Sequence, residues 1–420
     1  MRPVTFSLRI APISILFDDF LSAIAPEASV ESFPLEKALG RVLAETLTSP
    51  GDVPPFNNSA MDGFAFNRAE LAQGASVRLL IRGTSYAGTP WEGTLASGDA
   101  VRIMTGAATP EGADTVIPFE RTETIEENGN TYVVFEAGRV RPAENVRLRG
   151  EELRAGDAVM EPGIVLTSAY LGLAASLGRA ELRCRKLRVA VFSTGDELVE
   201  PGTAVALPPG KIWNSNSSVI SSLVRTWGAE AEDLGILPDD PDVIRKALSE
   251  AAARSDFLIA SGGVGEGEHD YTSRVLAEMG SGITHYHVSM RPGKPFSFGR
   301  VAGEHVCWFM ALPGNPVAAA VSAKLFLRRA LRLAAGSTEP LGLPDFPAIA
   351  AKDIKGRTGR TDLVRGRADF VDGEMRFTPA HSQSSGMLTT LAGMNAMAVL
   401  DVNTDRIAEG DAVRCLRLLS

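Results

Sequence analysis

The chain has 420 residues, a formal net charge of -9 at pH 7, and 45% hydrophobic and 22% charged residues. This length allows roughly two to four domains with sizeable cores, and the composition is ordinary for a globular protein. The negative charge argues against nucleic acid as a partner, because the phosphate backbone would be repelled over most of the surface. An anionic ligand would therefore need a local arrangement of cations or amides.

The three cysteines, Cys184, Cys307 and Cys415, stand far apart in the sequence. Because their number is odd and no pair shows C-x-x-C spacing, they indicate neither a disulfide framework nor a zinc site, and we expect buried thiols in a reducing compartment. An apolar stretch at residues 13–17 is bounded by Pro12 and two aspartates, which fits neither a signal peptide nor a membrane span. We therefore expect a cytoplasmic protein without a membrane partner.

In chain order, apolar residues at helical spacing predict one helix over residues 13–24 and a short one over 35–40. From residue 51 to 138, short apolar runs alternate with Gly, Pro and Asn, which is typical of strands and turns; the clearest runs are 77–81, 100–104 and 132–135. A helix over residues 168–177 follows, ended by a glycine. If it packs on the N-terminal helices, the β-rich segment is an insertion into a discontinuous first domain.

From residue 186 to 336, strand and helix patterns alternate. The predicted strands are 187–192, 231–237, 256–260, 284–290 and 306–312, and the predicted helices are 217–227, 241–254, 272–279 and 317–335. Such alternation predicts a doubly wound parallel sheet with helices on both faces. Beyond residue 341, short runs at 362–367, 375–378, 397–400 and 412–418 predict a small β-barrel or sandwich.

Together these patterns predict a multidomain α/β protein. The expected domains are a discontinuous helical domain (1–50 and 140–180), an inserted β-rich domain (51–139), a central α/β domain (181–336) and a C-terminal β-barrel domain (341–420). The central domain is the natural place for a ligand, because open α/β sheets bind ligands beyond the carboxyl ends of their strands.

Each predicted strand of the central domain is followed by a polar segment marked by glycine or proline. In chain order these segments are Ser193-Thr194-Gly195-Asp196-Glu197, Pro238-Asp239-Asp240, the loop from Ser261 to Asp270, Arg291-Pro292-Gly293-Lys294-Pro295 and Leu312-Pro313-Gly314-Asn315-Pro316. Because the carboxyl ends of parallel strands meet at one edge of a sheet, we expect the five segments to form one site.

The loop that begins at Ser261 is dense in glycine; its glycines are Gly262, Gly263, Gly265 and Gly267. Glycine permits positive φ and close approach of a ligand, so that successive amide N–H groups can converge on a phosphate. Taken alone, such a loop could equally be a structural turn. Asp270, just after the loop, adds a carboxylate where a hard divalent cation could bridge to that phosphate.

The residue types at this edge indicate two kinds of ligand, a metal ion and an oxyanion. Carboxylates without a nearby cysteine favour Mg²⁺ over zinc; they are Asp196, Glu197, Asp239, Asp240 and Asp270. Arg291 and Lys294 supply fixed positive charge for an oxyanion, and the start of the helix near Val317 could hold a further phosphate. The sequence therefore predicts a site for nucleotide phosphates and a divalent metal.

Structural roles stay open for several of these residues. Asp239 and Asp240 precede a predicted helix and could be N-cap residues instead of ligands. His269, His285 and His287 could act as bases, whereas a strand histidine such as His287 is more often packed or exposed. The turn at residues 313–316 could be architectural, although two prolines that stiffen a loop above a sheet edge also suit a binding rim.

With these motifs in order, the chain resembles the MoeA family, the molybdopterin molybdenumtransferases, whose eukaryotic counterpart is the E domain of gephyrin. The resemblance covers nearly the whole chain. It rests on Pro55-Phe56-Asn57-Asn58-Ser59-Ala60-Met61-Asp62-Gly63, Arg102-Ile103-Met104-Thr105-Gly106-Ala107, Phe192-Ser193-Thr194-Gly195-Asp196-Glu197-Leu198, Ser261-Gly262-Gly263-Val264, Arg291-Pro292-Gly293-Lys294-Pro295 and Leu312-Pro313-Gly314-Asn315-Pro316.

The resemblance implies that adenylylated molybdopterin is hydrolysed in the presence of molybdate and Mg²⁺, which leaves the metal on the dithiolene and releases AMP. It also implies a homodimer of four-domain subunits, with a cleft between one subunit's central domain and the partner's β-rich domains. An upstream adenylyltransferase would be a further partner.

By motif match, the resemblance gives catalytic roles to Asp62, Thr105, Glu197 and Asp270. Glu197, Asp239 and Asp270 would hold Mg²⁺ against the pyrophosphate and so neutralise charge on the bridging oxygen. The general base stays open between Asp62 and Glu197. Substrate contacts are implied for Ser193, Thr194, Gly195, Gly262, Gly263, Gly265, Arg291, Lys294, Pro313, Asn315, Pro316, Arg365 and Ser385; among them Arg291, Lys294 and Arg365 would hold molybdate and phosphates.

The chain departs from the family pattern at several positions. Gly265 stands where a serine is usual, and Glu266 brings a negative charge into a phosphate loop. Arg291 and His287 stand where lysines occur, and Glu152 stands where an aspartate is expected. These differences leave room for a divergent paralogue. Molybdate and tungstate are both tetrahedral dianions of similar size, so the sequence does not choose between them.

Two other functions stay open. Adenylylation of molybdopterin, the preceding step, predicts ATP consumption and needs neither the inserted nor the C-terminal domain; the presence of both argues against it. A non-catalytic scaffold predicts tight binding to a partner peptide and no dependence on the carboxylates. The sequence shows no recognisable linker or docking tail that supports a scaffold.

Overall fold

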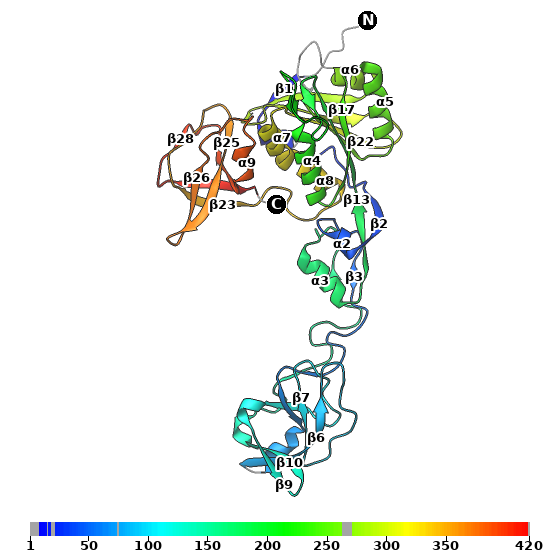
Figure 1. The fold of residues 1–420 in the computed structure, drawn as a ribbon, viewed down its shortest axis with the longest axis vertical. Helices are drawn as coiled ribbons and strands as arrows, with labels where there is room; N and C mark the ends of the chain where they lie inside the picture. Colours follow the sequence, from blue (N-terminus) through cyan, green and yellow to red (C-terminus); the bar gives the residue numbers. More distant parts are fainter. Residues whose placement is uncertain (1–7, 15, 18–21, 74, 263–270, 419–420) are drawn as a thin grey trace. The chain divides into compact units, whose positions relative to one another are not determined.

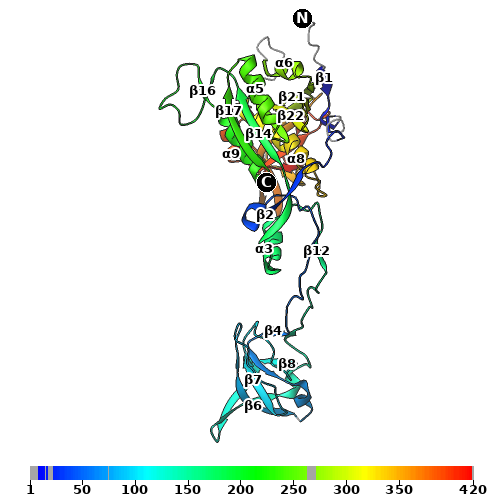
Figure 2. The ribbon, with the colours of Figure 1, turned by 90° about the vertical axis from the view of Figure 1, so that its right-hand side faces the viewer.

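The computed structural model describes residues 8–14, 16–17, 22–73, 75–262 and 271–418. The chain divides into two compact units, a larger one of residues 1–45 and 162–420 and a smaller one of residues 46–161 (Figures 1 and 2). Each has a hydrophobic core of its own. Over the described ranges, no helix has both the length and the apolar character that a membrane crossing requires.

The smaller unit is built on a six-stranded sheet in the order β8-β5-β7-β6-β10-β9. The strands are β5 (Gly63–Phe66), β6 (Ser76–Ser85), β7 (Asp99–Ile103), β8 (Thr115–Pro118), β9 (Glu123–Glu127) and β10 (Asn130–Glu136). Phe66, Leu79 and Val133 are buried in its core. The β-rich expectation for this segment is confirmed, and alternate apolar residues along β6 and β10 fill that core.

Short elements complete the smaller unit. Two-stranded pairs join β3 (Leu47–Thr48) to β12 (Ala158–Met160) and β4 (Asn58–Ser59) to β11 (Val146–Arg147). The 3-10 helices are η1 (Arg68–Gln73), η2 (Phe119–Arg121) and η3 (Ala137–Arg139). These pairs link the segments that enter and leave the six-stranded sheet.

In the larger unit, β2 (Ser29–Pro34) pairs antiparallel with β13 (Glu181–Lys186), and α2 (Leu35–Ala38) contacts α3 (Ser168–Ser176). The expected helices at 35–40 and 168–177 are thus confirmed, as is their packing. Of the helix expected over 13–24, residues 13, 14, 16 and 17 are helical, and 15 and 18–21 lie outside the described residues.

The central sheet of the larger unit has the order β1-β19-β21-β22-β18-β14-β17. Its strands are β1 (Leu8–Ala11), β14 (Arg188–Thr194), β17 (Glu230–Leu237), β18 (Phe257–Ser261), β19 (Gly282–Val288), β21 (Pro295–Val301) and β22 (Cys307–Leu312). Its helices are α4 (Ser215–Thr226), α5 (Pro241–Ala252), α6 (Tyr271–Glu278), α7 (Pro316–Ser322), the π-helical η4 (Ala323–Leu327) and α8 (Arg328–Ala334).

The α/β fold class is confirmed, and one detail needs correction: the sheet is mixed. Strand β21 was not predicted, and it pairs antiparallel with both β19 and β22, whereas the other pairings are parallel. Gly299 lies inside β21, where a Cβ atom would come within 1.9 Å of the Gly282 carbonyl oxygen. Glycine is needed there for close backbone approach, although in the sequence it reads as a strand breaker.

Helices cover both faces of this sheet. Val189 and Val191 of β14 pack in a cluster with α4 and the α7–α8 stretch, whereas Ala190 and Phe192 pack in a second cluster with α5 and α6. The alternation along one strand shows that the strand is buried on both sides, as its continuous apolar run predicts.

The C-terminal part of the larger unit is a β-barrel. Its sheet runs β20-β25-β26-β23-β29-β27, and an additional pairing of β25 with β27 closes it. The strands are β20 (Met290–Arg291), β23 (Asp345–Ala350), β25 (Thr361–Val371), β26 (Glu374–Pro379), β27 (Ala396–Leu400) and β29 (Ala412–Arg417). Helix α9 (Thr389–Ala392) and the pair β24 (Ile354–Lys355) with β28 (Arg406–Ile407) complete it.

Candidate active site

The carboxyl ends of four parallel strands lie in register at one edge of the central sheet. Thr194 of β14 pairs with Leu237 of β17, and Ser193 pairs with Ser261 of β18, which in turn pairs with Leu312 of β22. The segments that follow these strands therefore emerge side by side. This confirms the predicted shared edge for the described part of each segment.

Glycines let the backbones at this edge approach one another closely. Gly262 has φ +83°, and a Cβ there would lie 3.1 Å from the Thr194 carbonyl oxygen. The Cα atoms of Gly262 and Gly314 face each other across the same gap, since a Cβ on Gly314 would lie 3.7 Å from the Gly262 Cα. The positive φ and the tight contact together favour glycine at position 262, whereas a Cβ at Gly314 would make an ordinary van der Waals contact.

The Glu197 carboxylate folds back over Gly195. A Cβ at Gly195, which has φ +139°, would lie 2.6 Å from Glu197 Oε2. The glycine therefore leaves the space that the carboxylate occupies at the end of β14. Asp239 follows the neighbouring strand β17 and is exposed. Two acidic side chains thus follow adjacent parallel strands at the same edge.

Asp240, the residue after Asp239, has a structural role. Asp240 is the N-cap of α5, because one of its carboxylate oxygens accepts hydrogen bonds from the backbone N–H groups of Asp242 at 2.9 Å and Val243 at 3.2 Å. For Asp240 the capping alternative is therefore confirmed.

Two asparagines that the sequence interpretation missed tie the strand ends together. The Asn216 Nδ2 group donates to Ser261 Oγ and to the Gly314 carbonyl oxygen, each at 2.7 Å. Ser193 Oγ donates to Asn214 Oδ1 at 3.1 Å. Ser193, expected to contact substrate, is buried and uses its hydroxyl in this internal bond. The Asn-Ser-Asn triplet at the start of α4 was the available signal.

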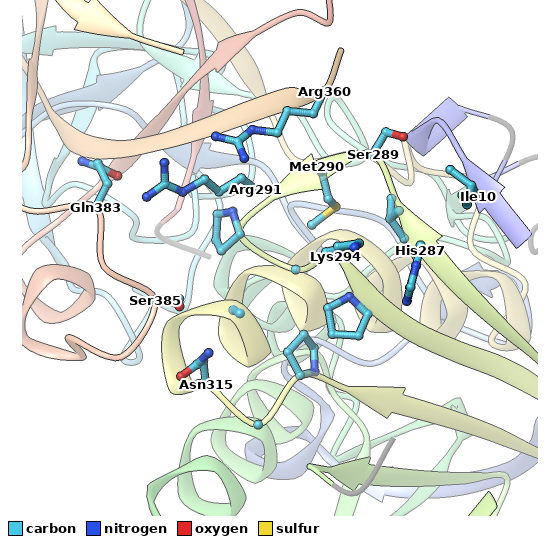
Figure 3. Close-up of a pocket in the computed structure, with 17 residues that line it drawn as sticks. Ile10, His287, Ser289, Met290, Arg291, Lys294, Asn315, Arg360, Gln383 and Ser385 are labelled. Atoms are coloured by element: carbon cyan, nitrogen blue, oxygen red, sulfur yellow. The ribbon is translucent and has the colours of Figure 1, made fainter. Parts of the chain in front are cut away.

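A cationic pocket of about 580 Å³ lies where the central sheet meets the C-terminal barrel; we call it the anion pocket. Its charged lining side chains are Arg291, Lys294 and Arg360, and among the described residues that line it there is no aspartate or glutamate. Figure 3 shows the Arg291 and Arg360 side chains directed toward the same part of the pocket, with Lys294 and His287 on its other side. A lining rich in cations favours an anionic guest.

Strand pairing fixes the arginine loop of this pocket. Met290 and Arg291 form β20, which pairs in parallel with Thr361 and Asp362 at the start of β25. Arg360, just before β25, is held by Asp362, with its Nη2 3.1 Å from Oδ1. The central domain and the barrel thus each contribute an arginine. Arg360 was missed because no local motif marks it.

Gly293 shapes the turn between Arg291 and Lys294. It has φ +101°, and a Cβ there would lie 2.5 Å from Met290 Cε and 2.6 Å from Ser322 Oγ. Both the backbone conformation and the space therefore require glycine. The turn keeps Arg291 and Lys294 exposed to the pocket.

The far wall comes from the barrel segment at residues 383–385. Ser385 lines the pocket, and its carbonyl oxygen accepts a hydrogen bond of 3.0 Å from Val317 N at the start of α7. The expectation that this helix start binds a phosphate is wrong for the Val317 amide, because a distant part of the chain already uses it. Pro313 and Asn315 line the pocket, whereas Pro316 begins α7 and does not.

Arg365 lies behind this wall and is fully buried. Its backbone N–H donates to Gln383 Oε1 at 2.9 Å, and its Nη2 donates to the Ser384 carbonyl oxygen at 3.1 Å. Burial, and then the nearby charge of Arg291, lower the pKa of the Arg365 guanidinium. Arg365 is absent from the pocket lining; it holds the 383–384 segment that forms the wall.

The smaller unit carries the other two expected catalytic residues. Asp62 Oδ1 accepts hydrogen bonds from Thr105 N and Thr105 Oγ1, each at 2.7 Å. The two motifs that contain them are also joined through their backbones, since Ser59 N donates to the Ala107 carbonyl oxygen and Gly106 N donates to the Ser59 carbonyl oxygen. The structure therefore brings these distant motifs together.

Part of the expected site lies outside the described residues. This holds for Gly263 and Gly265 of the substrate loop, for Asp270 of the metal set, and for Glu266 and His269. In the ranges that the structure does describe, no group of three His, Cys, Asp or Glu side chains converges as a metal site. Glu197 and Asp239 still supply oxygen donors at one edge, which is the ligand type that Mg²⁺ prefers.

Three known sequence families match consecutive parts of the chain. They are described as "MoeA N-terminal region (domain I and II)" over residues 13–178, "Probable molybdopterin binding domain" over 190–333, and "MoeA C-terminal region (domain IV)" over 347–418. Together they cover most of the chain in the order expected from the motifs.

Several similar proteins match this chain over most of its length. A molybdopterin molybdenumtransferase of Haemophilus influenzae is 38% identical over 91% of this chain and 92% of its own length. One of Nostoc sp. is 34% identical over 100% of this chain and 95% of its own length. The crystal structure of the molybdopterin biosynthesis moeA protein of Pyrococcus horikoshii OT3 covers 97% of this chain with a TM-score of 0.77 at 26% identity. With its motifs, its fold and these relatives in agreement, the chain belongs to the MoeA family.

Proposed function

We propose that this chain is a molybdopterin molybdenumtransferase, which uses molybdate and adenylylated molybdopterin, requires Mg²⁺ and releases AMP. The observation that carries the proposal is the anion pocket, whose described lining holds Arg291, Lys294 and Arg360 and, within the described ranges, no carboxylate. Molybdate is a tetrahedral dianion, and such a pocket offers it charge-assisted hydrogen bonds. The names of the full-length relatives support the same reaction.

The anion pocket and the strand-end edge have different roles in the proposed reaction. In the anion pocket, Arg291 and Lys294 bind the oxyanion, and Arg365 keeps the opposite wall in place through the 383–384 segment. At the strand-end edge, Gly195, Gly262 and Gly314 leave room for the substrate phosphates. The separation matters because the carboxylates at the edge would repel molybdate if they lined the same pocket.

Glu197 and Asp239 would hold Mg²⁺, with Asp270 as a third ligand by motif match. Their fit rests on the position of both described carboxylates at the ends of adjacent strands β14 and β17. Mg²⁺ held there would neutralise the charge that develops on the bridging phosphate oxygen during release of AMP. The chain's own part is to fix these oxygens next to the phosphate loop.

Asp62 and Thr105 complete the proposed site from the smaller unit of a partner subunit in a cytoplasmic homodimer. The proposal follows the family resemblance and the exposure of both side chains. Thr105 keeps Asp62 ionised, so the carboxylate acts as a fixed acceptor for substrate or for a Mg²⁺-bound water. Molybdate and tungstate both fit the charge of the pocket, and the upstream adenylyltransferase would deliver the substrate.

The test is an assay of AMP release from purified protein with adenylylated molybdopterin. We expect AMP release to require both molybdate and Mg²⁺. We expect Arg291→Gln to raise the molybdate concentration needed for half-maximal release. Consumption of ATP with unmodified molybdopterin would instead identify an adenylyltransferase. Absence of both activities in the folded homodimer would contradict an enzymatic role and favour the scaffold alternative.

A further inference from the structure

A second cavity in the larger unit, of about 650 Å³, shares no lining residue with the anion pocket. It is bounded by η4 and α8, by the end of α4, by the segment at residues 165–168 and by the C-terminal barrel. We call it the α8 cavity. Ala318 lines the anion pocket and Arg332 lines the α8 cavity, and a separation of 14 positions along the helical stretch corresponds to about 21 Å. The two cavities are therefore separate.

Cations line one side of the α8 cavity. Lys324, Arg328 and Arg332 are spaced four residues apart, so they lie on one face of the helical stretch and extend over about 12 Å. Arg417 of β29 adds a fourth cation. No aspartate or glutamate is among the residues that line this cavity in the described part of the chain. Like charges at this spacing repel one another, which an anion between them would relieve.

Among the described cations that line the α8 cavity, Arg332 has buried donors without a hydrogen-bond partner. It is 8% exposed, and its Nε and Nη1 have no hydrogen-bond partner among the described residues. Its neighbours differ: Lys324 Nζ donates to the Leu418 carbonyl oxygen at 2.6 Å, and Arg328 Nη1 donates to the Leu341 carbonyl oxygen at 2.9 Å. Buried donors without an acceptor are costly, so a ligand oxygen at this position would stabilise the structure.

The charges of these side chains are poorly compensated. Burial lowers the pKa of Lys324 to about 8 and that of Arg332 to about 10, and in both cases the nearby Arg328 adds to the effect. Glu339 is the one carboxylate that acts on Arg332 in the opposite direction, and its Oε1 accepts a hydrogen bond of 3.0 Å from Val165 N. A bound anion would supply the missing negative charge.

We propose that the α8 cavity binds a phosphate group, carried either by inorganic phosphate or by a nucleotide. The planar fork of Arg332 matches the oxygens of a phosphate, and the row of cations suits its double charge. Trp227 and Phe346 provide apolar wall beside the cations. A cavity of this size has the volume of a small-organic-ligand site, which leaves room for a nucleoside next to the phosphate.

The experiment is calorimetric titration of the full chain with inorganic phosphate and, separately, with AMP. Because the anion pocket would also take phosphate, the titrations use an Arg291→Gln, Lys294→Gln background. In that background we expect Arg332→Gln to weaken phosphate binding at least about tenfold, since two charge-assisted hydrogen bonds are lost. Arg417→Gln at the rim should weaken it less. Arg414→Gln is the matched control, because Arg414 lies on the same strand, is exposed and pairs with Asp345.

A folding control keeps the result interpretable. Arg332→Leu should unfold at the same or a higher temperature than the background protein without phosphate, because it removes a buried charge, and it should lose the stabilisation that phosphate gives. Tighter binding of AMP than of phosphate, with the same dependence on Arg332, would identify a nucleotide site; equal affinity would identify a phosphate site. Equal phosphate affinity in the background, Arg332→Gln and Arg417→Gln proteins would overturn the proposal, whatever the outcome of the AMP-release assay.

Discussion

Thr105 donates two hydrogen bonds to a single oxygen of Asp62, one from its backbone N–H and one from its hydroxyl, each 2.7 Å long. The backbone bond first, and then the hydroxyl bond, hold the pKa of the Asp62 carboxyl below its ordinary value. Asp62 is therefore ionised at neutral pH and a weak base. This arrangement suits an acceptor of hydrogen bonds better than a group that removes a proton.

The first prediction concerns this pair. Thr105→Val removes the hydroxyl donor and keeps the backbone donor, so the pKa of Asp62 should rise toward its ordinary value. If the ionised form is the active one, the acid limb of the kcat/KM profile should move to higher pH, so that kcat/KM falls at acidic pH and stays unchanged near neutrality. Thr105→Ser should restore the wild-type profile, and Thr131→Val, at an exposed position on β10, should have no effect. An unchanged acid limb in Thr105→Val would contradict the role.

The second prediction uses two adjacent aspartates. Asp239→Asn should raise the Mg²⁺ concentration needed for half-maximal AMP release by at least about tenfold, as loss of a metal ligand does. Asp240→Asn is the matched control, because asparagine caps a helix as well as aspartate and should leave the Mg²⁺ dependence unchanged. Equal Mg²⁺ curves for the two variants would show that Asp239 is not a ligand.

The third prediction separates binding from chemistry in the anion pocket. Arg291→Gln, Lys294→Gln and Arg360→Gln should each raise the apparent KM for molybdate about tenfold, because each removes a charge-assisted hydrogen bond. The kcat at saturating molybdate should change much less. Arg300→Gln, an exposed arginine on the unpredicted strand β21, controls for net charge. A fall in kcat alone would point to a catalytic instead of a binding role.

The fourth prediction is a matched pair of glycine variants. Gly293→Ala combines a positive φ with a clash against Met290 and Ser322, so it should destabilise the larger unit by about 3 kcal/mol. Gly359→Ala has φ +88° but open space around the new Cβ, so it should cost about 1 kcal/mol. Chemical unfolding followed by circular dichroism measures both. Similar losses would mean that the packing around Gly293 adjusts easily.

The fifth prediction concerns the three cysteines, which are buried and unpaired in the structure. Burial raises the pKa of the Cys184 thiol to about 11, and burial raises those of Cys307 and Cys415 to about 12. The thiolate is the reactive form, so none should react with Ellman's reagent at pH 8 in the native protein, and all should react in denaturant. A Ser249→Cys variant, exposed on α5, is the positive control. Rapid reaction of a native thiol would show that its core opens.

Local sequence patterns were enough to predict most of the fold. Helix α5 follows an aspartate that caps it, and α3 ends before Gly178, which has φ +73°, so both carry their boundaries in the sequence. Strand β21 does not, because its Pro295 and Gly299 are the residues that normally end a strand. Only the close approach of Gly299 to Gly282 explains why a glycine belongs there. Because β21 was not predicted, its antiparallel pairing was not predicted either, and the alternation of strands and helices indicated a parallel sheet.

The candidate site also contains some residues that the sequence could predict and others that it could not. Residues at the strand ends could be predicted because chain order and sheet direction place them at one edge. Arg360 and Gln383 could not, because tertiary contacts alone bring the barrel to the central domain. For the same reason the Val317 amide, which reads as a free helix start, is occupied by the Ser385 carbonyl oxygen. Sequence motifs locate groups on elements, whereas partners between distant elements come from packing.

The pairing of β20 with β25 has a practical consequence for protein engineering. It makes the arginine loop part of the barrel's own sheet, because Arg291 pairs in register with Asp362. A fragment cut near residue 340 would thus keep every central strand yet lose the support of the loop that we propose binds the oxyanion. The isolated α/β half should bind the organic part of its substrate and discriminate poorly among metal oxyanions, so swapping barrels between homologues is a direct route to altered metal selectivity.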